Sequence, residues 1–306
     1  MTTTFNPMPT SRWTRPARRF SIIAALGMAI VVVLGGCSLF KLGYGQASPI
    51  AFRWLDRYVD FDDAQSLRAR SALDEALAWH RRTQLPDYLG LLARAEVEVL
   101  DDATPERMCA WAADIRGRLD PVLQFLAPAI TDIALTLSPA QLAHIEKRFG
   151  ETNEEFRDEH LQRNPKRRQR AMVRRTVERA EMLYGRLGDA QREIVAEFVA
   201  MSPYSAERVD AERNDRQQDA LLFLRRLRES NSRRDDALLQ VRAFLRDVAR
   251  SPREGYRAYA ERVTAHNCAL ASALHNAASP AQRSEAAKRL KGYENDVRAL
   301  IGEGAG

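Results

Sequence analysis

Apolar residues recur at helical spacing along most of the chain beyond residue 48. Two clear runs of this kind are Leu142, Ile145, Phe149, Phe156 and Leu238, Val241, Leu245, Val248. Charged residues fill the positions between them, as expected for amphipathic helices that pack against one another. No segment shows the alternation of apolar and polar residues, bounded by hairpin turns, that is typical of strands. The pattern therefore predicts an all-α fold, a multi-helix bundle with no sheet.

A capping residue followed by proline marks many of the expected helix starts. Proline suits the first helical turn because its missing N–H would be unpaired there, and the preceding side chain accepts hydrogen bonds from free backbone amides. The eight pairs are Ser48-Pro49, Thr104-Pro105, Asp120-Pro121, Ser138-Pro139, Asn164-Pro165, Ser202-Pro203, Ser251-Pro252 and Ser279-Pro280. A Glu or Gln three residues after the cap completes a capping box. We expect such boxes at Ser138, Ser251 and Ser279, and a fourth at Asp62 with Gln65.

These signals predict roughly ten or more helices in one domain over residues 48–301. We expect helices over 49–58, 62–83, 86–100, 105–119, 121–136, 139–162, 165–186, 189–201, 203–229, 232–250, 252–277 and 280–301. The segment 122–137 is the most apolar and has Asp132 as its only charge, so it is expected at the centre of the bundle. Residues 302–306 are expected to form a flexible tail.

The N-terminus has the layout of a signal peptide. Arg12, Arg15, Arg18 and Arg19 precede an uncharged stretch of 16 residues, 21–36. A helix needs about 20 apolar residues to span the hydrocarbon core of a membrane. The stretch is therefore too short for a good membrane-spanning anchor, and we expect residues 1–36 to be removed.

The four residues Leu34-Gly35-Gly36-Cys37 resemble the lipobox of bacterial lipoproteins. This resemblance implies cleavage before Cys37, lipid on its sulfur and new amino group, and a linker over residues 37–47. Several acyl chains make such an attachment effectively permanent. Ser38, rather than Asp, follows the cysteine, which in the enterobacterial sorting rule implies the outer membrane, on its periplasmic face. The inner membrane and an uncleaved signal anchor are the alternatives.

Processing changes how the charge and the cysteines are interpreted. Without the four arginines of residues 1–36, the chain has 43 basic and 41 acidic residues, a net charge of +2. Nucleic-acid binding needs a concentrated positive surface, so we expect no nucleic-acid partner. Lipidation of Cys37 leaves Cys109 and Cys268. In an oxidising compartment these two could form a disulfide, or they could be separate buried thiols.

A short element repeats along the chain. Its copies are Leu137-Ser138-Pro139-Ala140-Gln141, Leu187-Gly188-Asp189-Ala190-Gln191 and Ala278-Ser279-Pro280-Ala281-Gln282. They resemble the Leu-Thr-x-x-Gln repeats of periplasmic helical chaperones of the Spy and CpxP type, although Ser or Gly replaces Thr and this chain is much longer. The resemblance implies a chaperone-like role. A capping box alone explains the same spacing, because Gln reaches back to the amide of the cap, and we favour that interpretation.

Three other segments carry a second resemblance. They are Leu42-Gly43-Tyr44, Trp54-Leu55-Asp56-Arg57-Tyr58-Val59-Asp60 and Trp79-His80-Arg81. With the lipobox and the Ser-Pro-x-Gln helix starts, they are similar to a family of uncharacterised proteobacterial lipoproteins, a domain of unknown function. The resemblance covers nearly the whole chain after Cys37. It implies a helical lipoprotein and supplies no activity.

Two clusters are candidate interaction surfaces. The first is Trp79, His80, Arg81 and Tyr88, where a histidine that titrates near neutrality would suit acid–base chemistry or anion binding. We favour a helix end, with Trp79 in the core and the two cations facing the negative end of the helix dipole. The second is the basic run Lys166, Arg167, Arg168 and Arg170, which would hold anionic headgroups. Pairing with the acidic residues just upstream is the favoured alternative.

The motifs of common enzyme classes are missing. The five histidines never pair at metal-binding spacing, and no nucleophile elbow, phosphate loop or dinucleotide fingerprint is present. We therefore expect no enzyme, no cofactor and no small-molecule substrate. The expected function is a structural or protein-interaction module of the cell envelope, with the membrane and another envelope protein as partners. The alternative is a chaperone-like or envelope-stress binder of unfolded periplasmic proteins.

Overall fold

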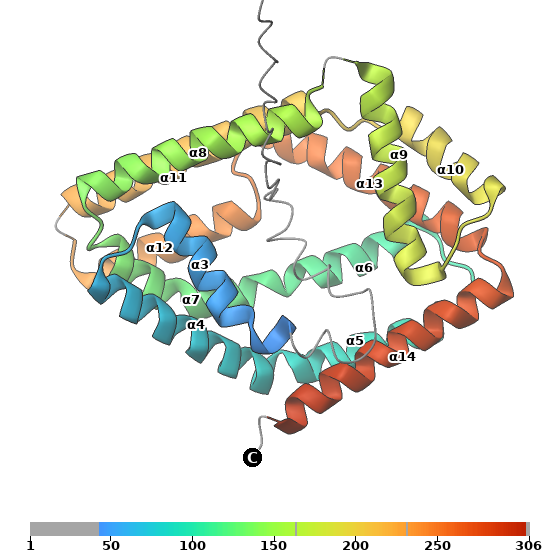
Figure 1. Ribbon diagram of the computed structural model, residues 1–306, viewed down its shortest axis with the longest axis horizontal. Helices are drawn as coiled ribbons and strands as arrows, with labels where there is room; N and C mark the ends of the chain where they lie inside the picture. Colours follow the sequence, from blue (N-terminus) through green and yellow to red (C-terminus); the bar gives the residue numbers. More distant parts are fainter. Residues whose placement is uncertain (1–42, 163, 231, 304–306) are drawn as a thin grey trace, which may run out of the picture.

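The computed structural model describes residues 43–162, 164–230 and 232–303. Within these ranges the chain forms twelve helices and no strand, which confirms the all-α prediction (Figure 1). The helices are α3 (Ala47–Val59), α4 (Asp63–Thr83), α5 (Leu85–Glu98), α6 (Pro105–Gly117), α7 (Leu119–Ala134), α8 (Pro139–His160), α9 (Pro165–Tyr184), α10 (Asp189–Ala200), α11 (Ala206–Glu229), α12 (Arg234–Ala249), α13 (Glu254–Asn276) and α14 (Pro280–Glu303). Every bound lies within three residues of its predicted position. In the described part of the chain, no helix is long and apolar enough to cross a membrane.

Several predicted helix starts differ from the observed ones. Thr104, Ser138, Asn164 and Ser279 do cap their helices, each accepting a hydrogen bond from the amide three residues later. The box at Ser251 is wrong, because α13 begins only at Glu254 and the Ser251 hydroxyl accepts from the Arg253 amide instead. The cap of α11 is Ser205 and not the predicted Ser202. Ser48 and Asp120 lie inside the first turns of α3 and α7, where proline is tolerated because the first amides have no intrahelical acceptor.

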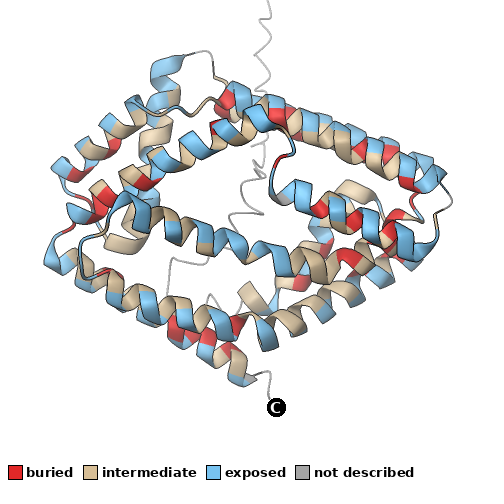
Figure 2. Ribbon diagram, turned by 180° about the vertical axis from the view of Figure 1, so that it is seen from behind, coloured by how far each residue is buried: buried red, intermediate tan, exposed pale blue. Residues whose placement is uncertain are grey.

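The helices form a flattened ring of packed pairs (Figure 1). Buried residues follow the faces where the paired helices meet, and exposed residues cover the rest of each helix (Figure 2). The predicted apolar segment is α7, which packs against α4, α6, α11 and α12 and buries Ala127, Thr131 and Ala134. It lies on one arc of the ring, so the fold has several local cores in place of the single centre that we expected.

The packing contacts repeat with a shift of six helices. In the first half (α3 to α8), α3 packs on α4 and α8, and α4 packs on α7. In the second half (α9 to α14), α9 packs on α10 and α14, and α10 packs on α13. The two halves therefore have the same internal arrangement.

Each half also receives two helices from the other. Helices α11 and α12, from the second half, pack on α8 and α7 of the first. Helices α5 and α6, from the first half, pack on α14 and α13 of the second, which is the same pairing after the six-helix shift. The halves are thus intertwined by a reciprocal exchange of helix pairs, and neither half is complete without the other.

The sequence carries traces of the same repeat. Tyr58 and Asp63-Ala64-Gln65 match Tyr184 and Asp189-Ala190-Gln191 at equal spacing, and Ser138-Pro139-Ala140-Gln141 with Lys147-Arg148 matches Ser279-Pro280-Ala281-Gln282 with Lys288-Arg289. The first match joins the ends of α3 and α9 to the starts of α4 and α10. The second covers the starts of α8 and α14. Sequence and packing together indicate an internal duplication.

The glutamines of the repeated element bond to one another in pairs. In the first half, the Gln141 side-chain amide donates to Oε1 of Gln65 at 2.5 Å, and the Gln65 amide donates back to Oε1 of Gln141 at 3.3 Å. In the second half, Gln191 and Gln282 exchange the same two bonds, both at 3.0 Å. We call these contacts the glutamine pairs. They join the start of α4 to that of α8, and the start of α10 to that of α14.

Every polar atom of the glutamine pairs is satisfied. Each Oε1 also accepts from the backbone amide of its own cap, Asp62, Ser138, Gly188 or Ser279. Each side-chain amide also donates to a backbone carbonyl of the loop before the opposite helix, at Thr136, Asp60, Ala277 or Arg186. The capping-box interpretation of the repeat is therefore confirmed, with a second role that the sequence did not show.

Replacing Gln141 by alanine should destabilise the fold. The change removes the bonds that the Gln141 side chain makes with Gln65, with the Ser138 amide and with the Asp60 carbonyl. Leaving a buried polar group unsatisfied costs about 1–3 kcal/mol. We expect the free energy of unfolding, measured by urea denaturation followed by circular dichroism, to fall by about that amount. The control Gln169→Ala, at an exposed position of α9, should stay within about 0.5 kcal/mol of the parent. Equal stability of the two variants would contradict a structural role for the pair.

Candidate functional site

The predicted lipidation site, Cys37, and the signal peptide over 1–36 lie outside the described residues. The described chain begins at Gly43, and its second residue, Tyr44, already packs against the helical body. The Tyr44 ring lies against the buried cluster of Leu85, Val297 and Leu300, contributed by α5 and α14. The C-terminal end of the predicted linker 37–47 is therefore docked on the body.

Tyr44 reaches the predicted cluster around His80. Its hydroxyl lies 3.0 Å from Nδ1 of His80, and Nε2 of His80 lies 3.2 Å from the hydroxyl of Tyr88. The Arg81 guanidinium lies 5.4 Å from the centre of the Tyr44 ring, within the range of a cation–π contact. Both ring nitrogens of His80 are thus occupied by tyrosines from elements on either side of α4.

The cluster has the features of a helix end. Trp79 is half-buried and stacks on Phe125 of α7, with ring centres 4.5 Å apart. His80 and Arg81 lie in the last turn of α4, and of the two expected cations only Arg81 is charged there, facing the negative end of the helix dipole. Burial lowers the pKa of His80 and raises the pKa values of Tyr44 and Tyr88. All three groups are therefore neutral at pH 7, and their contacts connect the end of the predicted linker 37–47 to α4 and α5.

The basic run lies on α9, in the other half of the molecule. Lys166, Arg167 and Arg170 are exposed. Arg168 pairs at 2.9 Å with Glu207, in the first turn of α11. Further along α9, Arg175 lies 3.9 Å from Glu159, one of the upstream acidic residues that we expected as partners. The structure does not bring this run together with the His80 cluster.

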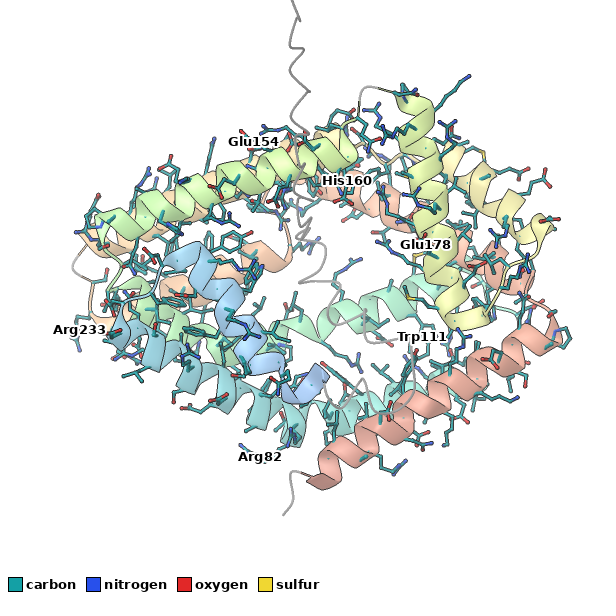
Figure 3. The ribbon with its side chains drawn as sticks, in the orientation of Figure 1. Arg82, Trp111, Glu154, His160, Glu178 and Arg233 are labelled. Atoms are coloured by element: carbon teal, nitrogen blue, oxygen red, sulfur yellow. A yellow bond between two sulfur atoms is a disulfide. The ribbon has the colours of Figure 1, made fainter. Side chains whose placement is uncertain are left out.

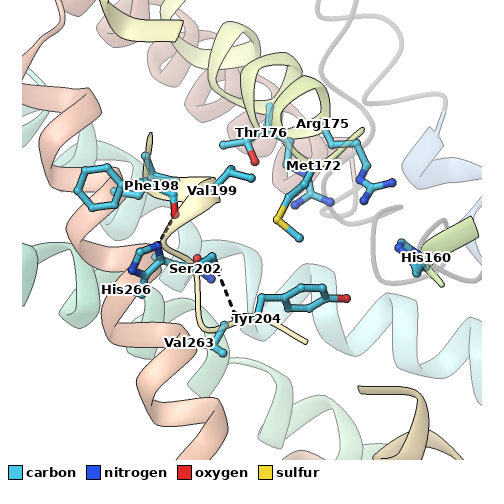
Figure 4. A pocket seen from close by; sticks show the side chains of 13 residues that line it. His160, Met172, Arg175, Thr176, Phe198, Val199, Ser202, Tyr204, Val263 and His266 are labelled. Carbon is cyan, nitrogen blue, oxygen red and sulfur yellow. Dashed lines mark hydrogen bonds between the residues drawn. The ribbon is translucent and has the colours of Figure 1, made fainter. Parts of the chain in front are cut away.

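A cavity of about 240 Å³ lies between the end of α8 and the helices α9, α10 and α13 (Figure 4). Met172, Val199 and the Tyr204 ring supply part of its apolar wall, and Arg175 and His160 lie toward one side (Figure 4). On the opposite side, Nε2 of His266 lies 2.7 Å from the Phe198 carbonyl oxygen. This cavity was not predictable from the sequence, because its lining joins residues between 160 and 204 to residues 263–270 of α13, and a single sequence does not show that these segments meet.

His160 is the most unusual group of this cavity. It is the last residue of α8, where that helix approaches the second half (Figure 3). It is 9% exposed, and its Nε2 has no hydrogen-bond partner within the described ranges, with a Glu159 oxygen 3.8 Å away. Burial lowers its pKa, and Arg175 and Arg213 act in the same direction against the opposing effect of Glu159. His160 is therefore a neutral, buried imidazole with an unused nitrogen at pH 7.

Cys109 and Cys268 form a disulfide. The bond joins α6 to α13 across a sequence separation of 159 residues, with the Cα atoms 5.3 Å apart. Because α6 is one of the exchanged helices, the bond fixes it covalently to the other half. Elsewhere in the ranges that the structure describes, no group of three or more His, Cys, Asp or Glu residues could hold a metal ion.

Removing the disulfide should lower stability strongly. In the chain-entropy model, a cross-link that closes a loop of about 160 residues stabilises the fold by about 5 kcal/mol. We expect a Cys109→Ser/Cys268→Ser variant to lose up to that amount, measured by thermal unfolding. A reducing agent should produce the same shift in the parent protein and none in the variant. If the parent is insensitive to reductant and shows two free thiols in a thiol titration, the bond is absent.

The stability should depend on pH through His80. Its folded-state pKa lies below the ordinary value of 6.5, so the unfolded chain takes up the proton first as the pH falls. The contribution to stability is therefore complete above about pH 6.5 and is lost as the pH falls through the folded-state pKa. We expect His80→Gln to reduce the loss in urea midpoint between pH 7.5 and 5. Tyr44→Phe, which keeps the imidazole and its burial, should lower the urea midpoint at every pH and leave the slope of that midpoint against pH unchanged. An unchanged slope in His80→Gln would contradict this role.

Comparison with known proteins gives a single result. No curated protein matches the chain, and no solved structure does. A model of a family of unknown function (DUF6279) matches residues 57–247, which is more than half of the chain and extends from α3 into α12. The description of the family assigns no activity. The chain belongs to the DUF6279 family of unknown function.

Proposed function

We propose that the chain is a lipoprotein of the outer membrane whose helical ring is a structural or protein-interaction module of the cell envelope. The observation that carries this proposal is the docking of Tyr44 on the body, seven residues after the predicted lipidation site. Seven extended residues reach at most about 25 Å. With lipid on Cys37, the junction of α4, α5 and α14 would therefore lie close to the membrane surface.

The disulfide supports a location in the periplasm. Disulfides form and persist in oxidising environments, including the bacterial periplasm, and are rare in the cytosol. Cys109 and Cys268 are bonded across the interface between the exchanged helix α6 and α13. A bond that closes the ring in this way suits a protein that folds after export.

The junction near the anchor has a suitable charge for a membrane surface. Arg81 and Arg82 lie in the last turn of α4, next to the residue on which Tyr44 docks. Cationic side chains near a bilayer are attracted to anionic headgroups. The docked tyrosine, the two arginines and the short linker together favour one fixed orientation of the body above the lipid.

A chaperone-like role is the second candidate. Several large apolar side chains are mostly exposed, among them Leu67, Val97, Ile115, Met201 and Leu239, and exposed apolar surface is what an unfolded client would bind. The repeated glutamines do not favour this role, because the glutamine pairs use them within the chain. The interaction module is therefore the better-supported function.

Lipid labelling and crosslinking test the proposal together. In cells grown with labelled palmitate, the protein should carry label, Cys37→Ala should lose it, and Cys109→Ser should keep it as the matched control. Ser38→Asp should move the protein from the outer-membrane to the inner-membrane fraction. Crosslinking in intact cells should then capture one dominant envelope protein.

Two results would contradict the proposal. Label that persists in Cys37→Ala would exclude lipidation at this residue. Crosslinks spread over many unrelated periplasmic proteins, together with suppression of aggregation of a denatured client by the purified protein, would favour the chaperone-like role instead.

A further inference from the structure

The cavity beside His160 has a divided lining. One part is apolar, with Met172, Val199 and Leu270 around the Tyr204 ring. The other part is polar and cationic, with Arg175 on α9 and the buried His160 at the end of α8 (Figure 4). Ligand pockets commonly have such a lining, in which an apolar wall is combined with a few polar groups that fix orientation.

The charge of the lining favours an anion. Among the described residues, the lining includes the arginines Arg175 and Arg179 and no carboxylate side chain. Just outside the lining, Oε1 of Glu159 lies 3.9 Å from Nη1 of Arg175 and 3.8 Å from Nε2 of His160, and both distances are beyond hydrogen bonding. The planar guanidinium therefore has N–H groups available for a carboxylate or phosphate, the groups that it binds best.

The unused nitrogen of His160 points to a second polar contact. A buried polar atom without a hydrogen-bond partner is costly, so each such atom in a folded protein calls for an explanation, and a bound ligand group is one that fits an atom facing a cavity. Nε2 of His160 is such an atom in the described part of the chain. A neutral imidazole beside an arginine is suited to donate to an anionic oxygen.

The duplication provides an internal comparison. The six-helix shift relates the end of α8 and the helices α9 and α10, which line this cavity, to the end of α14 and the helices α3 and α4. In that second place, the chain fills the junction itself, because the Tyr44 ring packs against apolar residues and its hydroxyl bonds to a histidine, His80. The first half therefore fills the equivalent place with a side chain of its own, and the shift of 141 residues puts the apolar Ile301 where the second half has His160.

We propose that this cavity binds a small amphiphilic anion, whose carboxylate or phosphate head contacts Arg175 and His160 and whose apolar body lies against Met172, Val199 and Tyr204. The cavity volume of about 240 Å³ suits a ligand with a few apolar carbons beyond its head group. The site is independent of the lipid anchor, so it stands whether or not Cys37 is modified.

Calorimetric titration of the purified full-length protein tests the site. Hexanoate and hexyl phosphate are the probes, because they share the short apolar body and differ in the anionic head, and they show which head is preferred. Hexan-1-ol and hexylamine are the neutral and cationic controls. At least one anionic probe should bind with one site per chain, and neither control should bind at the same concentration.

Two variants on the same helix localise the binding. Arg175→Gln should weaken binding of the preferred anion by about tenfold or more, the effect of losing one charge-assisted hydrogen bond. The control Arg174→Gln removes a neighbouring arginine whose side chain is exposed and lies 3.8 Å from Glu178, and it should bind as the parent does. His160→Phe, which keeps a ring at the end of α8, should also weaken binding. Thermal unfolding of each variant shows that it is folded.

The proposal is overturned if neither anion binds at millimolar concentration. It is also overturned if hexan-1-ol binds as well as the anions, because the cationic side would then contribute nothing. Equal weakening by Arg174→Gln and Arg175→Gln would show general attraction to the basic face of α9 and would likewise overturn the site.

Discussion

The two glutamine pairs are the contacts on which the arrangement of the helices depends. The side-chain amide of glutamine donates and accepts hydrogen bonds in one plane, so two paired glutamines fix the relative position of the two helix starts that carry them. Each helix start also has backbone amides that need an acceptor. In each half, the two helix starts lie so that a glutamine accepts from the backbone amide of its own cap and also donates to the glutamine of the opposite helix. Because these groups are buried or half-buried, the register is enforced by the cost of leaving an amide unsatisfied as much as by the bonds themselves.

The exchange of helix pairs closes the ring, and the two halves secure it differently. Position 268 of α13 corresponds to position 127 of α7 in the repeat, by the same shift of 141 residues that relates Gln282 to Gln141. Cys268 bonds covalently to the exchanged helix α6. Ala127 instead lies in an apolar cluster with Ala237 and Val241 of the exchanged helix α12, all nearly inaccessible to solvent. One interface is therefore held by a covalent bond and the equivalent one by close packing of small side chains, which needs no particular compartment.

The helices were predictable because their signals are local. Ser138 with Gln141 and Thr104 with Pro105 determine helix starts through neighbouring backbone amides, and each was placed correctly. The failures at Ser202 and Ser251 occur where a hydroxyl satisfies a loop amide instead, a choice that depends on how the loop packs. Neither the partner of Gln141 nor the closeness of His160, Arg175 and Tyr204 was predictable. These contacts join residues separated by tens of positions, and a single sequence does not show which helices meet.

The duplication also places two different structures at equivalent positions of the fold, a docked tyrosine in the first half and an open cavity in the second. In a duplicated fold, each place where helices meet occurs twice. The fold is stable when each of the two copies is either filled by side chains or lined by groups that tolerate water or a ligand. In the first half, Tyr44 fills the place where α4, α5 and α14 meet, so the start of the described chain is packed against the helices. In the second half, α9 extends over 20 residues where α3 has 13, and its longer N-terminal part supplies Met172 to the cavity, while Arg175 stands at the position equivalent to Pro49 of α3. A buried imidazole nitrogen without a partner, such as Nε2 of His160, is poorly suited to stabilising a core, since it loses hydration without gaining a hydrogen bond. Its presence opposite a closed and satisfied copy of the same junction is therefore best explained by a ligand that completes it.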